Sequence, residues 1–257
     1  MNKNIDTTAK KLVNAFLKNK LISPIPKKYT KNIFHADKLR ILCESKIKNT
    51  VIGYKAGGTA LPLLKKFKEK EPFYAAVFKQ NLLKNRSKVK INKYTLGIEL
   101  EVCYLINKNI FDFKSPITKK NVHKYIMYMA PCIEIVGYRQ KKIGIKSLGD
   151  LCSDFGANVK FILGKKIKYK RIKINNLKSI ISNSKLNHSV SGNTKAVYVD
   201  PINSLRFVLK KLKMSKTRLN NNFYVFTGST IGVAPIQGSG YYIGKIEKLG
   251  SVSVKII

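Results

Sequence analysis

The chain is poor in acidic residues, with 13 aspartates and glutamates against 51 lysines and arginines in 257 residues and a formal net charge of +38. Long apolar runs are also lacking: no uncharged stretch approaches the length of a membrane span, and the first residues show no apolar core of a signal peptide. We therefore expect a cytoplasmic protein with no membrane partner.

Cysteine is scarce as well. The four cysteines, Cys43, Cys103, Cys132 and Cys152, show no Cys-x-x-Cys spacing, and Cys103 and Cys132 fall inside apolar stretches that we predict to be core strands. We expect all four to be reduced and structural, as in a cytosolic protein.

Arginine makes up few of the basic residues, since only six of the 51 are arginines. Base-edge and bidentate phosphate recognition favour arginine, whereas the lysines here are spread along the whole chain. We therefore expect no specific nucleic-acid partner and interpret most of the charge as a solvated surface that attracts small anionic substrates. The hydrophobic content of 44% is that of an ordinary globular protein.

Hydrophobic periodicity predicts an α+β protein. Residues 1–50 read as a helical N-terminal region, with Leu12, Phe16 and Leu17 at helix spacing and a second helix over 36–47. Residues 51–257 read as a mixed, strand-dominated domain. In it we predict strands over 51–58, 75–78, 96–106, 132–136, 223–226, 241–246 and 251–256, helices over 121–129 and 203–213, and an edge hairpin within 165–185.

Three of the rare acidic residues lie in apolar stretches. Glu99 and Glu101 are two residues apart in the predicted strand 96–106, so their side chains share one face, and Glu134 lies in the strand 132–136. Pairing of the two strands would bring the third carboxylate to the first two. Carboxylates so close together repel one another unless a cation neutralises them.

Oxygen ligands favour Mg2+, Mn2+ or Ca2+, and a site with few protein ligands and open positions suits Mg2+ or Mn2+ best. The alternative for a Glu-x-Glu pair is that the glutamates pair with lysines at a sheet edge. The apolar flanks and the third glutamate favour the metal.

A series of short motifs follows the order and spacing of one enzyme family. They are Gly53-Tyr54-Lys55-Ala56-Gly57, Glu99-Leu100-Glu101, Pro131-Cys132-Ile133-Glu134-Ile135-Val136 with Arg139, Asp154, Asp200-Pro201-Ile202-Asn203, Thr227-Gly228-Ser229 and Leu249-Gly250-Ser251-Val252. Together they resemble the 2-keto-4-pentenoate hydratase family of the fumarylacetoacetate hydrolase superfamily, and the resemblance covers nearly the whole chain.

The resemblance implies a mixed β-roll like the C-terminal domain of fumarylacetoacetate hydrolase, a small helical N-terminal region, and assembly into homo-oligomers. It also implies that Glu99, Glu101 and Glu134 bind one Mg2+ or Mn2+ ion and that Lys55 is catalytic. The implied activity is that of a hydro-lyase in aromatic compound catabolism. Water would add to a small 2-oxo-enoate, formed from a 2-hydroxy-2,4-dienoate, to give a 4-hydroxy-2-oxo acid.

The remaining motif residues have supporting roles in this interpretation. Asp154 would orient a metal-bound water as a catalytic residue, or else pair with a basic group. Arg139 would bind a substrate carboxylate, or else pair with an acid at the surface. The hydroxyls and amides of Thr227, Gly228 and Ser229 would line the substrate pocket, or else form only a strand-ending turn.

The chain departs from the family at Phe73, where an acid–base carboxylate is usual, and at Phe155, where an asparagine is frequent. Glu71, two residues before Phe73, is the candidate replacement for the missing carboxylate. Decarboxylation of a 2-oxo-enedioate and hydrolysis of an acylpyruvate stay open, because the same metal-stabilised enolate serves all three reactions. The non-enzyme alternative is a polyanion-binding protein that retains an enzyme fold.

Overall fold

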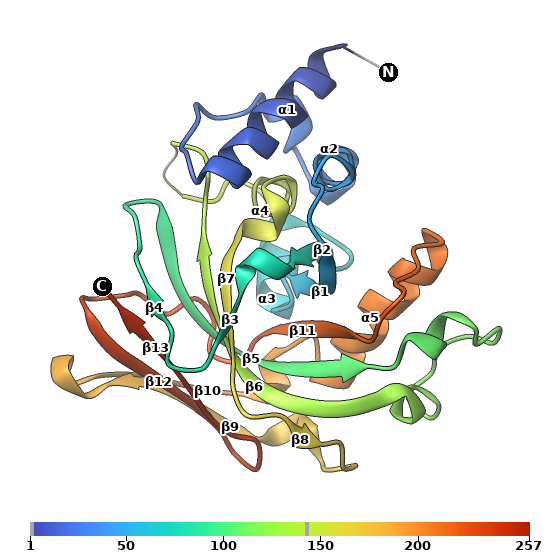
Figure 1. The fold of residues 1–257 in the computed structure, drawn as a ribbon, viewed down its shortest axis with the longest axis vertical. Helices are drawn as coiled ribbons and strands as arrows, with labels where there is room; N and C mark the ends of the chain where they lie inside the picture. Colours follow the sequence, from blue (N-terminus) through green and yellow to red (C-terminus); the bar gives the residue numbers. More distant parts are fainter. Residues whose placement is uncertain (1–2, 142–143) are drawn as a thin grey trace.

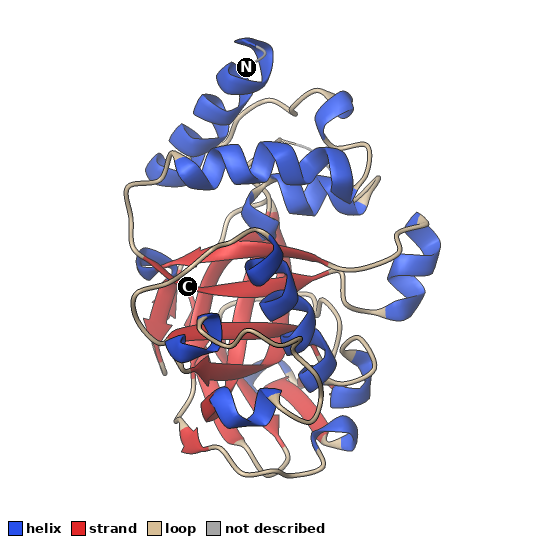
Figure 2. Cartoon of the chain, turned by 90° about the vertical axis from the view of Figure 1, so that its right-hand side faces the viewer, coloured by secondary structure: helices blue, strands red, loops and turns tan. Residues whose placement is uncertain are grey.

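The computed structural model describes residues 3–141 and 144–257, which form two curved sheets with helices at one end and along one side (Figures 1 and 2). The helices are α1 (Lys3–Lys18), α2 (Ile33–Ser45), α3 (Leu61–Phe67), α4 (Leu148–Ser153) and α5 (Pro201–Met214). In this described part of the chain, none of the helices combines the length and the apolar character needed to cross a bilayer.

The larger sheet has eight strands and is built around β5 and β6. Seven of its strands follow the order β2-β1-β11-β5-β6-β7-β3, and the short β8 pairs with β6. The strands are β1 (Val51–Gly57), β2 (Phe73–Phe78), β3 (Leu82–Lys84), β5 (Thr95–Ile106), β6 (Ile126–Gly137), β7 (Asn158–Leu163), β8 (Ile167–Lys168) and β11 (Phe223–Ser229). The near-continuous apolar runs of β5 and β6 form a long antiparallel pair at its centre.

The smaller sheet has the order β10-β9-β12-β13-β4 and packs face to face on the larger one. Its strands are β4 (Lys88–Val89), β9 (Lys178–Asn183), β10 (His188–Asn193), β12 (Gly240–Ile246) and β13 (Gly250–Ile256). Burial alternates along β12: Tyr242 and Ile246 face the core, whereas Tyr241 and Ile243 are exposed. A side chain at Gly244 would overlap Leu100 of β5, so the sheets touch closely there. The predicted α+β mixed β-roll is confirmed.

The N-terminal helices cover the end of the larger sheet that carries β1 and β2 (Figure 1). Phe16 of α1 packs against Phe78 of β2 and against Phe155, and Leu39 of α2 joins the same core. Leu17, which we predicted on the apolar stripe, is exposed because it lies beside that stripe on the helix. The division of the chain at residue 50 stays a prediction.

Two sequence predictions were wrong. Residues 121–129 do not form a helix: a 3-10 turn over Val122–Tyr125 leads directly into β6, because residues from Ile126 onward pair with β5. Apolar residues three apart, such as Ile126 and Met129, fit either structure in sequence, and strand pairing decides. Residues 165–185 are not a hairpin either, since β8 pairs with β6 while β9 pairs with β10 and β12 in the other sheet.

Candidate metal centre

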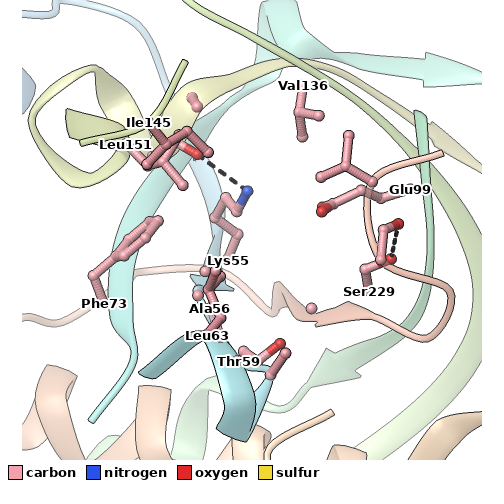
Figure 3. Close-up of a pocket in the computed structure, with 18 of the residues that line it drawn as sticks. Lys55, Ala56, Thr59, Leu63, Phe73, Glu99, Val136, Ile145, Leu151 and Ser229 are labelled. Carbon is pink, nitrogen blue, oxygen red and sulfur yellow. Dashed lines mark hydrogen bonds between the residues drawn. The ribbon is translucent and has the colours of Figure 1, made fainter. Parts of the chain in front are cut away.

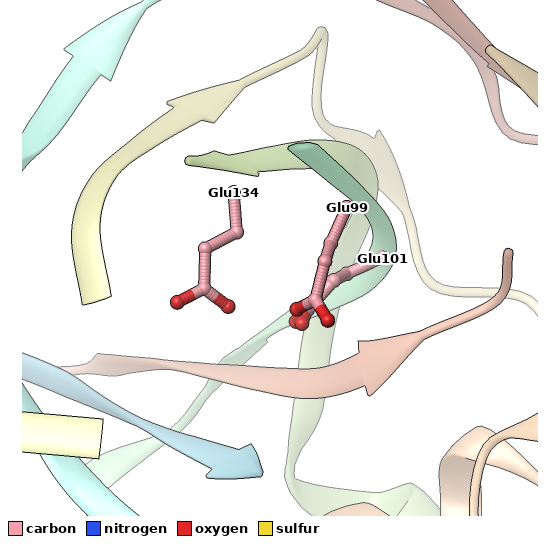
Figure 4. A group of neighbouring side chains, drawn as sticks. All are labelled: Glu99, Glu101 and Glu134. Carbon is pink, nitrogen blue, oxygen red and sulfur yellow. The ribbon is translucent and has the colours of Figure 1, made fainter. Parts of the chain in front are cut away.

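The three glutamates meet on the larger sheet. In the register of β5 and β6, Glu99 lies directly opposite Glu134, and Glu101 follows two residues along on the same face. One carboxylate oxygen from each residue lies within 4.8 Å of the others, and Figure 4 shows the carboxylates converging. The clustering that strand spacing predicted is thus present, and the metal-binding role stays a prediction.

A bulge in β11 holds Glu101 in place. The pairing of β11 with β5 shifts register between Phe226 and Ser229, and the Gly228 amide donates to Glu101 Oε2 over 3.1 Å. Gly228 has φ +99°, and a Cβ there would overlap Thr59 Oγ1, so this position requires glycine.

The other two residues of this motif differ in where their hydroxyls point. Thr227 Oγ1 donates to the Val102 carbonyl over 2.8 Å inside the sheet, so this buried hydroxyl supports the backbone. Ser229 lies at the edge of the cavity described below, where its hydroxyl donates to the Gly232 carbonyl.

Lys55 projects from β1 toward the carboxylates and is 3% exposed. Its Nζ donates to Glu134 Oε1 over 2.7 Å and to the Gly156 carbonyl over 3.1 Å. Burial lowers the pKa of Lys55, but the charges of Glu134, Glu99 and Glu101 outweigh it and raise the pKa above its ordinary value. The ammonium therefore stays charged in this environment.

Burial is the main reason that all three carboxyls have raised pKa values. It brings the pKa of Glu99 to about 8 with help from the charge of Glu134, and that of Glu101 to about 7 with help from Glu99. The pKa of Glu134 rises to about 8 although Lys55 opposes the shift. One lysine does not balance three carboxylates, so this cluster favours an additional positive charge.

The donor set fits a hard divalent cation. Glu101 Oε1 and Glu134 Oε2 are buried and have no hydrogen-bond partner among residues 3–141 and 144–257. Opposite oxygen ligands of Mg2+ or Ca2+ are about 4 to 5 Å apart, which matches the spread of the carboxylate oxygens. Unsatisfied buried carboxylate oxygens are costly, so a cation here would satisfy what the protein leaves unpaired.

Arg139 and Asp154 form a buried pair beside the site. Arg139 Nη1 lies 2.9 Å from Asp154 Oδ1, and the Arg139 amide donates to Asp154 Oδ2 over 2.7 Å. The same guanidinium donates to the Asn158 carbonyl. Among the described residues, those lining the cavity include neither member of the pair. Both side chains thus bind each other and backbone groups. Of the two roles that the sequence offers for Asp154, the structure shows the pairing with a basic group.

The pair spans a strained loop. Phe155, Gly156 and Ala157 have φ values of 51°, 68° and 57°, which is costly for the two residues that carry a Cβ. This conformation points the Gly156 carbonyl at Lys55. Sequence reasoning missed this contact because a backbone acceptor leaves no side-chain signature.

Glu71 does not take the place of the carboxylate that is usual at the Phe73 position. Its carboxylate pairs with Lys211 of α5, and it lines a separate hollow with Lys68 and Met214. Phe73 itself is 2% exposed, and its ring forms part of the wall of the cavity next to Lys55.

The centre opens into a cavity of about 460 Å³. Figure 3 shows Glu99 and Ser229 on one side, Lys55 in the middle, and Phe73, Leu151 and Ile145 on the other side. One end of the cavity therefore carries the charged groups and the other end is apolar. No sequence pattern indicates this apolar end, because its residues come from four separate segments: β2, α3, α4 and the residues before α4.

The fold is that of enzymes of the fumarylacetoacetate hydrolase superfamily. No protein-family model matches the sequence, and no curated protein matches it. Among solved structures, 4-oxalocrotonate decarboxylase from Pseudomonas putida G7, complexed with magnesium and adipate, superposes with a TM-score of 0.83. That match covers 100% of this chain and 98% of the decarboxylase at 18% identity.

Two further structures share the fold over a smaller part of the chain. Fumarylpyruvate hydrolase from Pseudomonas aeruginosa, in complex with Mn2+ and pyruvate, matches with a TM-score of 0.57 and 13% identity, over 82% of this chain and 93% of that one. A 2-hydroxyhepta-2,4-diene-1,7-dioate isomerase from Mycobacterium marinum matches with a TM-score of 0.54 and 12% identity, over 81% of this chain and 76% of that one.

Proposed function

We propose that the protein is a divalent-metal-dependent enzyme that hydrates a 2-oxo-enoate, formed from its 2-hydroxy-2,4-dienoate, to a 4-hydroxy-2-oxo acid. The observation that carries the proposal is the buried convergence of three carboxylates, with Lys55 against Glu134, at the end of an apolar cavity. The fold supports it, since solved structures with this fold include a decarboxylase, a hydrolase and an isomerase of 2-oxo or 2-hydroxydienoic acids.

Glu99, Glu101 and Glu134 would hold one Mg2+ or Mn2+ ion. When bound, such an ion supplies Lewis acidity to the 1-carboxylate and 2-oxo oxygen of the substrate. The Gly228 amide fixes Glu101, and Lys55 fixes Glu134, so two of the ligands are oriented before substrate arrives.

Lys55 is the group placed to move protons. Its Nζ lies between the carboxylate end and the apolar end of the cavity (Figure 3), where the carbon chain of a bound 2-oxo acid has to pass. The Gly156 carbonyl holds the ammonium in position. We assign to it the proton that carbon 5 of the dienol gains, and the enol oxygen returns its own proton to the lysine. Water then adds across the double bond, with its hydroxyl at carbon 4 and its proton at carbon 3.

Arg139 and Asp154 are positioning residues in this proposal. They hold the loop whose Gly156 carbonyl contacts Lys55, and neither side chain is free to bind substrate.

Decarboxylation of a 2-oxo-enedioate is the second candidate. Two observations favour it: the full-length likeness to a 4-oxalocrotonate decarboxylase, and Phe73 at the position of the usual acid–base carboxylate. An apolar wall would also promote loss of a charged carboxylate as neutral carbon dioxide.

The test follows the ultraviolet absorbance of freshly made 2-hydroxypenta-2,4-dienoate with the protein, with and without Mg2+ or Mn2+. We expect metal-dependent loss of the dienol signal that Glu101→Ala abolishes and the exposed control Glu247→Gln retains. Identification of a 4-hydroxy-2-oxo acid supports hydration. Carbon dioxide released from a 2-oxo-hexenedioate, without turnover of the dienol, would replace hydration by decarboxylation.

A further inference from the structure

We infer that the cavity selects 2-oxo acids whose far end is uncharged and apolar, so that a single carboxylate, at the metal end, is recognised. The inference rests on the proposed function, since it places the 2-oxo acid group at Glu99, Glu101 and Glu134. It concerns the opposite end of the cavity, where Phe73 stands at the position of the usual acid–base carboxylate.

The far wall belongs to a small hydrophobic core of its own. Phe73 packs there with Leu64, Leu148 and Cys152, and the partly buried Leu63 and Leu151 join the cluster while also lining the cavity. The wall is thus the exposed surface of a packed apolar core. A charged group placed against it would lose its hydration without compensation.

The ring of Phe73 lies close to the backbone of two glycines, Gly57 and Gly156. A Cβ at Gly57 would overlap the ring, and a Cβ at Gly156 would approach its Cε2 to 3.4 Å. Gly156 also lies against the Lys55 stem. The Phe73 ring therefore stands next to the catalytic lysine, and the carbons of the substrate beyond that lysine meet an aromatic surface.

Two cations in the described part of the chain bear on this wall, Arg40 behind it and Lys66 in its lining. Arg40, whose charge reaches Cys152 behind the wall, is 1% exposed and binds Asp37 and Glu44 at 2.6 Å each. Lys66 is the one further lysine in the described lining, and its exposed ammonium lies over the Phe67 ring at 5.6 Å. Nothing in that lining therefore fixes a cation where a second substrate carboxylate would arrive.

The volume leaves room for an apolar chain. A five-carbon 2-oxo acid has eight non-hydrogen atoms and fills roughly a third of the cavity of about 460 Å³ at the density of packed interiors. Several more carbons fit before the mouth is reached. Each added methylene that is buried against the wall should tighten binding by up to about fourfold.

The test uses saturated 2-oxo acids, which bind without being hydrated. Calorimetric titration in Mg2+ compares 2-oxohexanoate, 2-oxooctanoate and 2-oxoadipate. 2-Oxoadipate has the same six carbons as 2-oxohexanoate but carries a second carboxylate at its far end. We expect 2-oxohexanoate to bind at least about tenfold more tightly than 2-oxoadipate, and 2-oxooctanoate to bind more tightly again.

A matched pair of variants tests the wall itself. Leu63→Arg places a cation on the cavity side of α3 and should reverse the preference in favour of 2-oxoadipate. Leu61→Arg adds the same charge on the same helix at a residue that is 50% exposed and outside the cavity lining, and should leave the preference unchanged.

Binding of 2-oxoadipate as tight as that of 2-oxohexanoate, or no gain from the longer chain, would overturn the inference and leave the proposed function standing. Failure of all three acids to bind in Mg2+ and in Mn2+ would overturn both. Equal changes of preference in the two arginine variants would mean that net charge, and not the wall, sets selectivity.

Discussion

The thermal stability of the protein should rise when one charge of the Glu99, Glu101 and Glu134 cluster is removed, and should fall when a bound metal is removed. The carboxylate oxygens lie within 4.8 Å of one another, and two unit charges at that separation repel by roughly 3.5 kcal/mol at an effective dielectric constant near 20. Lys55 offsets part of this repulsion, because its Nζ contacts Glu134 directly. The metal-free protein therefore carries an unfavourable term of a few kcal/mol whenever all three carboxyls are ionised.

Glu99→Gln removes that term without removing the side chain. At pH 9 in EDTA we expect the variant to unfold about 5 to 10 °C above the wild type, since about 1 kcal/mol corresponds to 2–4 °C in a chain of this size. Adding Mg2+ at about 100 times its Kd should stabilise the wild type by about 2.7 kcal/mol, again roughly 5 to 10 °C. The variant should lose most of this response because it has lost a charged ligand.

Thermal unfolding followed by differential scanning fluorimetry measures both effects in one series. Glu247→Gln is the control: it removes an acidic charge at an exposed residue in the turn between β12 and β13, and should behave as the wild type. A metal-free Glu99→Gln protein that unfolds several degrees below the wild type, or that keeps the full Mg2+ response, would refute the electrostatic reasoning.

Four further predictions concern the same centre. Lys55→Met should lower kcat on the dienoate by about 10² to 10⁴ and leave Mn2+ binding in place, as measured by absorbance and metal titration. Asp154→Ala should cost about 3 to 5 kcal/mol of unfolding free energy in urea, because it strands a buried guanidinium. In EDTA, the stability of the wild type should fall as pH rises from about 4.5 to 8. Burial raises the pKa of Glu134 to about 8, so the folded state keeps a proton that the unfolded chain releases at lower pH. Gly228→Ala should weaken Mn2+ binding in the same titration, because a Cβ at this positive-φ residue overlaps Thr59 and displaces the amide that holds Glu101.

Each of these predictions has a contrary result. Wild-type turnover in Lys55→Met would remove the lysine from the chemistry. Unchanged unfolding of Asp154→Ala would mean that the buried pair contributes no stability. Stability in EDTA that rises between pH 4.5 and 8 would contradict the raised carboxyl pKa values, and saturating Mg2+ should abolish the predicted fall. Unaltered metal affinity in Gly228→Ala would show that the bulge does not position its carboxylate.

The sequence predicted the parts of the fold and site that follow from local periodicity. Two-residue spacing was enough to put Glu99 and Glu101 on one face, and a second apolar run was enough to place Glu134 on a strand. The apolar runs 96–106 and 132–136, which lie within β5 and β6, read as strands from the sequence. The helix predicted over 121–129 failed because its apolar spacing also fits a strand, and only pairing with β5 distinguishes the two.

The features of the site that the sequence did not predict depend on contacts between distant segments. The Gly156 carbonyl reaches Lys55 across 101 residues, and Arg139, just after the end of β6, binds both ends of the strained loop. The short helices α3 and α4 have too few residues to show a period, yet they supply Leu63 and Leu151 to the cavity wall. Motif order located the residues around the site, and tertiary packing determined which of them face the cavity.

Because acidic residues are scarce in this chain, three of them in one buried cluster require an explanation. Three other buried or half-buried acids have cations of their own: Glu44 binds Arg40, Asp154 binds Arg139, and Asp200 binds Lys119 while capping α5. In the cluster, by contrast, three carboxylates share Lys55, in a chain with 51 basic residues from which partners could have been drawn. Stability alone favours replacing two of these glutamates by apolar residues. Their retention together is therefore best explained by a ligand that needs the negative charge, and the Mg2+ response of Glu99→Gln is the measurement that decides it.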